Sequence, residues 1–427
     1  MRVLFSVKLL SFFALTLSIR AAEWPQFRGP NHDSTTSEKI SAKWPAQGPK
    51  LLWKIPVSGG FGSIAVSKGK AYTLTLRELD GVAHEVCLAL DANSGKELWA
   101  AQLTVANYLE KNQTGQANSG APDNTGGDGP RSTPSVDGDR VYVLTGTLVL
   151  YCLDAQNGKM IWRKDLVREH HGRNISWSNA ASPLIDGDLV FVAGGGEGEA
   201  LLAFNKKTGA VVWKGEDDTM THSTPALATI HGVLQVIFFT QKGLASLETK
   251  SGKVLWRFPF RFSTSTAMTP VVAGNIVYCS AGYGVGSSAA KITKSGDAFT
   301  ATELWNKSAK EFNNHWSTPL FKDGYLYGLF GFKEYGKCPL KCIEVATGEV
   351  KWSKEGFGPG GTILAGDKLV VLGDAGQIVI AVPTPKAYTE LARANVLKGK
   401  CWSTPVVADG RIYARSAKEV VALDVKP

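Results

Sequence analysis

A ten-residue segment recurs along this chain and limits its fold more than any other feature. It reads LDANSGKELW at residues 90–99, LDAQNGKMIW at 153–162 and FNKKTGAVVW at 204–213. An alternating apolar run comes first, a polar turn with a glycine follows, and a tryptophan stands at the end. Glycine accepts the positive φ that a tight hairpin loop needs. We therefore predict that every copy is a β-hairpin.

A second motif alternates with this hairpin. It reads STPSVDGDRVYV at 132–143 and STPVVADGRIYA at 403–414, and each copy holds two short apolar segments joined by a glycine turn. Eight such openings occur when the weaker versions are included. Two hairpins in succession give a four-stranded antiparallel sheet, and repeats of about 45 residues with four strands are typical of β-propellers. The sequence predicts an all-β chain that forms an eight-bladed β-propeller.

Tryptophans mark the outer strand of the predicted blades. Successive members are 43 to 63 residues apart, which is one blade of chain. We interpret them as structural side chains that fill the wedge between neighbouring blades, where a ring of radial sheets needs bulky apolar groups. These residues are Trp53, Trp99, Trp162, Trp213, Trp256, Trp305 and Trp352.

The two ends of the chain are predicted to share one blade. The last residues, VVALDVKP, stop just past the Asp of an eighth hairpin. The stretch GPKLLWKI at 48–55 contains Trp53 but has no hairpin partner before it. Pairing of this N-terminal strand with the C-terminal blade would close the ring and leave no free sheet edge there.

The first 43 residues differ from the repeats. Arg2 and Lys8, then an apolar stretch and small residues, are typical of a signal peptide over 1–22, with a retained interfacial anchor as the alternative. We expect a leader segment at 23–43 and the propeller at 44–427. No later segment has the roughly 18 uninterrupted apolar residues of a membrane span, and no cysteine near the expected cut could carry a lipid. The sequence therefore predicts a periplasmic or secreted protein.

Charge and cysteine content narrow the class of protein further. The net charge is +9 without a basic run, so no nucleic-acid partner is expected. We also expect a monomer. The sequence contains no C-x-x-C-H, which excludes haem attachment through that motif. Six cysteines are present, and Cys338 and Cys342 are the closest pair. Spacing alone leaves open whether these two are bridged.

The hairpin D-x-x-T/S-G-x-x-x-W and the S-T-P opening together resemble the pyrroloquinoline-quinone-type (PQQ-like) propeller repeat, in its eight-bladed, secreted bacterial form. The resemblance covers the chain from about Trp44 to Asp424. The stretch EWPQFRGPNHD at 23–33 is similar to the leader of secreted bacterial members. We expect that leader to pack against the side or rim of the ring.

This resemblance implies two kinds of function. In the quinoprotein dehydrogenases, PQQ lies on the axis over a tryptophan, beneath a disulfide of adjacent cysteines and beside a Ca²⁺ and a catalytic aspartate; this chain has no adjacent cysteines. Non-catalytic members, such as the periplasmic outer-membrane assembly lipoprotein, bind other proteins. The sequence favours a non-catalytic scaffold for a protein or envelope component, with no catalytic residue, cofactor or metal. The alternative is a quinoprotein-type oxidoreductase, or a protein that binds PQQ with calcium or another small ligand in the tunnel.

Alignment of the S-T-P openings predicts a site at one mouth of the axial tunnel. The residues just before each opening enter the innermost strands, where eight chain segments converge. Arg, His and Trp side chains together would suit an anionic or aromatic ligand or a peptide anchor, and ordinary packing and rim roles are the alternative. The glycine-rich stretch 104–130 is expected to cover the tunnel in part. The candidates are Arg131, Arg173, Trp177, His222, His315, Trp316 and Trp402.

Overall fold

The computed structural model describes residues 23–106, 129–308, 310–332 and 337–427. The signal peptide expected at 1–22 and most of the stretch expected to cover the tunnel lie outside the described residues. Helix in the described ranges is confined to α1 (Leu166–Glu169) and the 3₁₀ turn η1 (Lys310–Phe312). Neither of these two described helices is long and apolar enough to cross a membrane.

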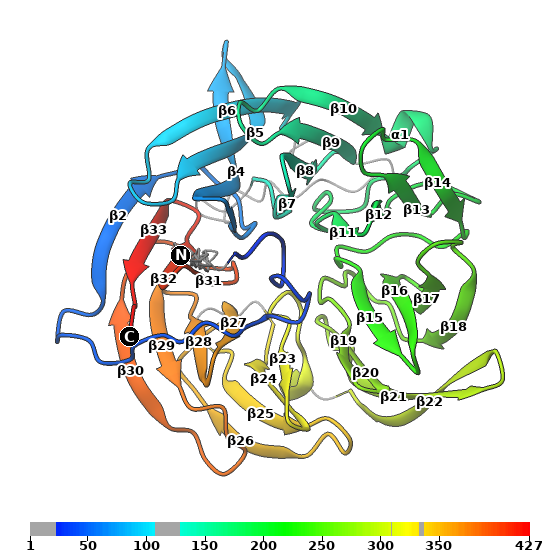
Figure 1. Ribbon diagram of the computed structural model, residues 1–427. Coiled ribbons are helices and arrows are strands. Elements are labelled where there is room, and N and C mark those ends of the chain that lie inside the picture. The colour runs from blue at the N-terminus through cyan, green and yellow to red at the C-terminus, as the bar shows by residue number, and fades with distance from the viewer. Residues whose placement is uncertain (1–22, 107–128, 309, 333–336) are drawn as a thin grey trace, which may run out of the picture.

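Eight antiparallel sheets surround a central axis, as the sequence predicted (Figure 1). We number these blades by the order of their innermost strands. Blade 1 contains β3 (Ala65–Ser67), β4 (Lys70–Leu79), β5 (Val82–Asp91) and β6 (Glu97–Val105). Blade 2 contains β7 (Ser135–Asp137), β8 (Arg140–Leu144), β9 (Val149–Asp154) and β10 (Met160–Asp165). Blade 3 contains β11 (Leu184–Asp186), β12 (Leu189–Ala193), β13 (Leu201–Asn205) and β14 (Val211–Gly215). Blade 4 contains β15 (Ala226–Ile230), β16 (Val233–Thr240), β17 (Gly243–Glu248) and β18 (Val254–Pro259).

The second half of the ring follows the same order. Blade 5 contains β19 (Val271–Ala273), β20 (Ile276–Ala281), β21 (Gly286–Ser295) and β22 (Ala298–Lys307). Blade 6 contains β23 (Leu320–Lys322), β24 (Tyr325–Leu329), β25 (Leu340–Glu344) and β26 (Val350–Lys354). Blade 7 contains β27 (Gly361–Ala365), β28 (Lys368–Leu372), β29 (Gln377–Ala381) and β30 (Glu390–Asn395), with β1 (Thr35–Thr36) added to β27. Blade 8 contains β31 (Val406–Ala408), β32 (Arg411–Arg415), β33 (Glu419–Asp424) and β2 (Lys50–Pro56).

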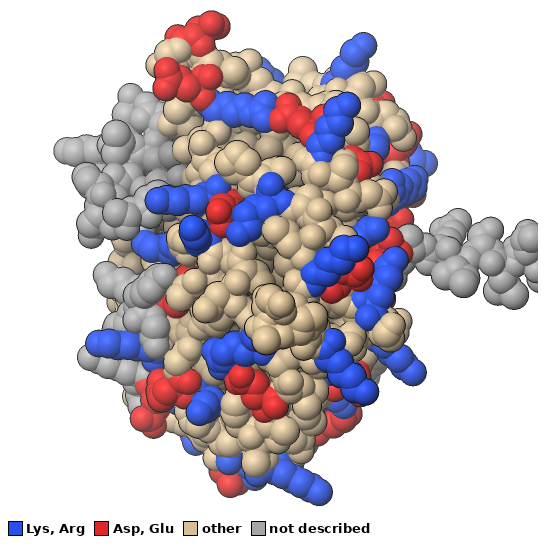
Figure 2. Space-filling view, turned by 90° about the vertical axis from the view of Figure 1, so that its left-hand side faces the viewer, with Lys and Arg blue, Asp and Glu red and all other residues tan. Residues whose placement is uncertain are grey.

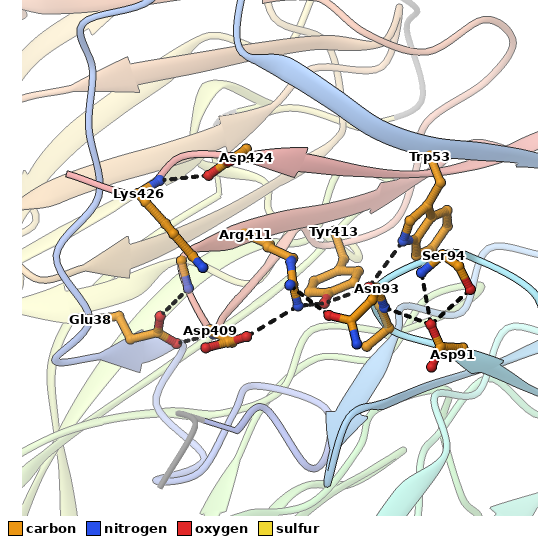
Figure 3. Close-up of polar contacts among 12 residues, drawn as sticks. Glu38, Trp53, Asp91, Asn93, Ser94, Asp409, Arg411, Tyr413, Asp424 and Lys426 are labelled. Atoms are coloured by element: carbon orange, nitrogen blue, oxygen red, sulfur yellow. Dashed lines mark hydrogen bonds and ion pairs between the residues drawn. The ribbon is translucent and has the colours of Figure 1, made fainter. Parts of the chain in front are cut away.

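Blade 8 confirms that the two ends of the chain close the ring. Strand β2 pairs antiparallel with β33 from Lys50 opposite Asp424 to Pro56 opposite Glu419. The joint continues into blade 1, where Trp53 Nε1 donates to Ala92 O at 3.0 Å (Figure 3). Every strand of blade 8 is therefore held by main-chain bonds, although its outermost strand precedes the other three by about 350 residues of chain.

The repeated hairpin turn is held by its polar residue and its glycine. In blade 1, Asp91 Oδ1 accepts from Ser94 N at 2.8 Å, and Gly95 adopts a φ of 72°. A one-residue bulge follows, because Ala89 pairs with Trp99 while Leu90 pairs with Glu97. The bulge leaves Leu98 facing solvent and directs Trp99 into the interior.

The hairpin tryptophan of one blade docks on the hairpin turn of the next. Trp99 Nε1 donates to Ala155 O at 3.2 Å, and a Cβ on Gly158 would lie 2.6 Å from the Trp99 ring. Glycine is needed there both for its positive φ and for this close approach. Trp256 departs from the pattern and donates to Gln235 Oε1 of its own blade at 2.7 Å. The other indoles that donate to the following blade belong to Trp53, Trp162, Trp213, Trp305 and Trp352.

The S-T-P opening links the innermost strands around the axis. Thr133 Oγ1 accepts from Ser63 N at 2.8 Å, and Thr133 N donates to Ser182 Oγ at 2.8 Å. Ser182 N in turn donates to Thr224 Oγ1 at 2.9 Å, so blades 2, 3 and 4 each offer a hydroxyl to the main chain of the blade before them. Thr269 N and Thr318 Oγ1 repeat the contact at 3.1 Å in the second half of the ring. This motif is therefore a structural element that fixes neighbouring blades to one another.

Replacing Thr133 with valine should lower the free energy of unfolding by about 1–3 kcal/mol, because the buried Ser63 N–H would lose its acceptor in a site of the same shape. Chemical denaturation of the variant tests this. The matched control is Thr302→Val, because Thr302 is exposed on β22. Equal losses for the two variants would contradict a specific role for the hydroxyl of the S-T-P opening.

All six cysteines are buried and none is in a disulfide, including Cys338 and Cys342, for which spacing left the question open. Cys338 follows the loop of blade 6, and Cys342 lies within β25 opposite Trp352. Burial raises the pKa of the Cys342 thiol to about 11. The Cys342 thiol is therefore protonated at neutral pH and packs as a small apolar group.

The leader, which the sequence placed at the side or rim of the ring, lies at one end of the ring. It crosses the middle of the ring in Figure 1 before the chain turns out to β2. Its Glu38 carboxylate accepts from Asp409 N at 3.0 Å and Gly410 N at 2.7 Å, at the turn between β31 and β32 (Figure 3). The alternating apolar pattern that identifies the strands could not predict this route. The leader is held by separate main-chain bonds and not by a regular hairpin.

Candidate functional site

One end of the axial channel gathers aromatic side chains, and we call this end the mouth. Here the chain enters the innermost strand of each blade. Trp402, just before blade 8, lies 4.5 Å from Trp316 and 5.1 Å from Phe61, measured between ring centroids. Trp316 also contacts Phe332 at 6.2 Å and the neighbouring His315 at 5.2 Å. The sequence alignment of the openings thus brought Trp316, Trp402 and His315 together, and the structure does the same.

The cluster continues around the axis through Tyr283. Its ring lies 4.3 Å from Phe332, 5.3 Å from His315 and 6.1 Å from Trp177. Trp177 then lies 6.4 Å from His222. The contacts form one continuous set that we call the aromatic arc, and its members come from six of the eight blades. They are Phe61, Trp177, His222, Tyr283, His315, Trp316, Phe332 and Trp402.

The backbone of the arc is strained at two of its aromatic residues. Trp177 has a φ of 66° and Tyr283 a φ of 56°, both in the left-handed region that bulky residues avoid. Each such residue costs about 1–3 kcal/mol and persists only where its surroundings fix it. Arg131 supplies one such restraint, because its Nη1 donates to Trp177 O at 3.0 Å. Arg131 therefore positions Trp177 at the mouth.

His222 is a neutral side chain whose two ring nitrogens are both in use. Its Nε2 lies 2.8 Å from Ser176 O, which can only accept, so Nε2 carries the proton. Its Nδ1 then accepts from Ser265 Oγ at 2.7 Å. Burial, with Arg131 as a smaller cause, lowers the pKa of His222 to about 4. His222 holds the mouth together and offers neither a metal-ligating lone pair nor a proton at neutral pH.

Further polar groups at the arc are the His315 ring, the indole N–H groups of Trp316 and Trp402, and the ammonium of Lys400. Burial lowers the pKa of His315 to about 3, so this ring is also neutral. Trp316 Nε1 donates to Pro359 O at 2.8 Å. Lys400 Nζ lies 4.3 Å from the centroid of the Trp402 ring, a cation–π contact. Trp402 Nε1 is buried and has no acceptor within the described ranges, so this indole N–H is a donor that a bound molecule could use.

Arg173 does not join the arc. Its side chain is exposed, and no ring contact or hydrogen bond within the described residues ties it to the cluster. Conversely, the sequence alignment missed Phe61, Tyr283 and Phe332. Phe61 lies just before the weak opening of blade 1, where the S-T-P letters are missing. Tyr283 and Phe332 lie in the turns β20–β21 and β24–β25, which the alignment on the openings did not cover.

The described residues do not fit a PQQ–calcium site of the kind that the sequence resemblance implied. Calcium requires six to eight oxygen ligands, several of them carboxylates. No three His, Cys, Asp or Glu side chains within the described ranges lie close enough together to hold a metal ion. None of the six cysteines is in a disulfide, so the disulfide that the resemblance places over PQQ has no counterpart among them.

A cavity of about 460 Å³ lies on the mouth side of blades 3 and 4, away from the arc. Asp218 Oδ2 accepts from Lys242 N at 3.2 Å within it, and Glu216 pairs with Arg257. Asp217 Oδ1 also accepts from Gly198 N at 2.7 Å, so all three acidic side chains of the cavity are engaged in bonds. This cavity offers no arrangement of free acid and base.

Comparison with known proteins places the chain in a family. Residues 83–328 match the family described as outer membrane protein assembly factor BamB. The chain belongs to this family. It is 23% identical over 322 residues to BamB of Moranella endobia, a match that covers 72% of this chain and 62% of that protein. It is 25% identical over 266 residues to the tetrathionate hydrolase of Acidithiobacillus ferrooxidans, covering 62% of this chain and 45% of that enzyme.

Proteins named for other activities share this fold. The crystal structure of a quinohemoprotein alcohol dehydrogenase from Comamonas testosteroni matches with a TM-score of 0.66 at 14% identity, over 94% of this chain and 80% of that chain. The likeness shows a common PQQ-type eight-bladed propeller. The chain spans 45% to 62% of the length of the curated relatives it matches, so their activities and partners do not transfer directly.

Proposed function

We propose that this protein is a non-catalytic β-propeller of the bacterial envelope that binds another protein through the aromatic arc. The BamB-type relatives, named as assembly factors, support a binding role. A periplasmic or secreted location follows from the signal peptide that the sequence predicts. The chain acts as a monomer in this proposal, because the ring closes within one chain.

The observation that carries the proposal is the chemistry of the arc itself. Eight rings contact one another at one mouth, and the two histidines among them are neutral and buried. Buried aromatic anchors provide most of the energy of protein interfaces, whereas proton transfer needs a group that titrates near the working pH. The strained φ angles of Trp177 and Tyr283 also fit a surface shaped for binding.

Electrostatics give no support to a nucleic-acid partner. Figure 2 shows Lys and Arg side chains distributed among Asp and Glu side chains over the side of the ring that lies at the left in Figure 1. Pairs such as Lys54 with Glu419 and Arg393 with Glu390 belong to this pattern. A phosphate backbone is bound by clustered basic groups, so this face suits solvent better than nucleic acid.

Removing two stacked rings should abolish binding at the mouth. A photoreactive residue at the exposed position Arg173 is expected to crosslink a discrete envelope protein in cells. The double variant Trp316→Ala/Trp402→Ala should reduce that yield at least tenfold, because buried interface aromatics each contribute about 2 kcal/mol or more. The matched control places the photoreactive residue at Leu98, exposed on the outer wall. The same product from both positions, or one that persists in the double variant, would contradict the proposal.

A small ligand at the mouth is the second candidate, and the unpartnered Trp402 Nε1 beside the stacked Trp316 ring favours it. PQQ with calcium is the probe to test first, followed by thermal unfolding and dye-linked alcohol oxidation. A saturable rise in Tm with turnover would replace the scaffold proposal by an enzyme. A rise without turnover would mean a ligand-binding propeller, and no rise leaves the protein-binding proposal in place.

A further inference from the structure

The leader binds the innermost strands at the end of the axial channel opposite the mouth, which we call the far end, and it contains a turn at residues 27–32 between its two strand-like contacts. Its main chain pairs first with blade 1. Trp24 N donates to Val66 O at 2.9 Å, and Val66 N donates to Trp24 O at 2.8 Å. The next residue reaches blade 2, where Val136 N donates to Pro25 O at 2.7 Å. Two blades thus hold consecutive leader residues by strand-like bonds.

After crossing the axis, the leader adds a strand to blade 7. Strand β1 pairs parallel with the inner edge of β27, with Thr35 opposite Leu364. Leu364 N donates to Ser34 O at 2.9 Å, and Gly366 N donates to Thr36 O at 2.8 Å. The innermost strands therefore accept an extended chain in both directions, antiparallel on blade 1 and parallel on blade 7.

Two side chains anchor the leader between these strands. Trp24 is 1% exposed, and Gly29 packs on it so closely that a Cβ would lie 3.0 Å from the indole. Arg28 is 4% exposed; its Nε donates to His32 O at 3.0 Å and its Nη1 to Pro319 O at 3.3 Å. An indole and a guanidinium four residues later thus fill the far end.

The ring does not depend on the leader for its own closure. Blade 8 is closed by β2 and β33, and neighbouring blades are joined by the tryptophan bonds and the S-T-P hydroxyls. Gln26 Oε1 and His32 Nδ1 are buried without a hydrogen-bond partner in the described part of the chain. The leader therefore resembles a bound ligand more than a ninth structural element.

We propose that the far end of the axial channel is a binding site for peptides that pair with the innermost strands on both sides of a turn, and that the leader is its occupant in cis. The leader defines the ligand chemistry: an aromatic side chain followed by proline in a strand-like segment, and then a turn that carries arginine and glycine at the fourth and fifth positions after the aromatic residue. Main-chain pairing with a few side-chain anchors is how strand addition recognises peptides. A partner segment with these features competes with the leader, whose tether gives it a high effective concentration. This inference is independent of the function proposed for the mouth.

The test uses the tether, because Pro45, Ala46 and Gln47 are exposed between the leader and β2. A protease site replaces these three residues, and the purified full chain is cut there. The probe is a fluorescent synthetic peptide of residues 23–44, followed by anisotropy. We expect saturable binding to the cut protein, at least tenfold tighter than to the uncut protein. Peptides with Trp24→Ala or Arg28→Ala should compete at least tenfold more weakly, whereas Asn31→Ala, at an exposed position, should compete as well as the parent.

Two results would overturn the proposal. Loss of the cooperative thermal transition on cutting, or a cut protein that never exchanges its own leader for the probe, would make the leader a permanent part of the fold. A second measurement needs no cut. In the intact chain, the amides of Val66, Val136 and Leu364 should exchange hydrogen at least tenfold faster than that of Val143 on β8. Equal protection would also reject a displaceable leader.

Discussion

Replacing Trp53 with alanine is expected to lower the free energy of unfolding by about 3–5 kcal/mol, the usual cost of removing a large buried aromatic side chain. Trp53 is 7% exposed and lies between blades 8 and 1. Its indole donates to Ala92 O at 3.0 Å, its ring lies 6.0 Å from Tyr413, and Gly95 packs directly on it. The change therefore opens a cavity at the joint where the ring is closed.

Urea denaturation followed by far-UV circular dichroism measures this loss. The matched control is Leu51→Ala, on the same strand but 50% exposed, for which a change within about 0.5 kcal/mol is expected. A small effect of Trp53→Ala, similar to that of the control, would mean that the ring tolerates an open joint. That result would refute the interpretation of this tryptophan as the wedge that closes the ring.

Acidification from pH 7 to pH 4 is expected to destabilise the protein strongly. Burial lowers the pKa of His32 to about 4, of His222 to about 4 and of His315 to about 3, from an ordinary value of 6.5. Below pH 6.5 the unfolded chain binds protons that the folded protein cannot, so stability that is present above pH 6.5 is lost as the pH falls towards 4. One pKa unit corresponds to about 1.4 kcal/mol, so His222 alone accounts for about 3 kcal/mol of the loss.

The free energy of unfolding as a function of pH tests this expectation. His222→Gln retains polar atoms but does not titrate, so its loss between pH 7 and 4 should be about 3 kcal/mol smaller than that of the parent. His171→Gln is the control, because that side chain is exposed. If His222→Gln follows the same pH curve as the parent and the control, His222 is protonated in the folded protein and its neutral state at the mouth is wrong.

The fold was predictable because each blade repeats the same local physics. The fixed interval from Asp91 to Trp99 signals a hairpin turn, and the structure shows the glycine and carboxylate contacts that require it. The closing strand could be placed because GPKLLWKI has a tryptophan without its own hairpin. The sequence pattern gave no sign that the S-T-P hydroxyls join the blades, since those bonds run between residues about 50 positions apart.

The site was less predictable than the fold. Aligning the openings identified Trp316 and Trp402 because these residues occupy equivalent places in two repeats. Tyr283 and Phe332 have no such equivalence, as they lie in turns whose length and conformation differ from blade to blade. Arg173 was predicted for the site but does not join it, because its side chain is directed to solvent although its neighbours lie at the mouth. Repeat position predicts which end of a ring a residue occupies, but the direction of a loop side chain depends on local backbone angles.

The pairing of β2 with β33 means that the position of the chain termini in the ring is not fixed by the fold. Blade 8 is completed by hydrogen bonds and not by a covalent link, so the seam of the ring can be moved without changing any sheet. An exposed turn without packing contacts, such as Gly296–Asp297 between β21 and β22, is a suitable point for new termini in a circularly permuted chain. The sequence order of the blades can therefore change, whereas the closed ring depends only on the contacts between neighbouring blades and strands.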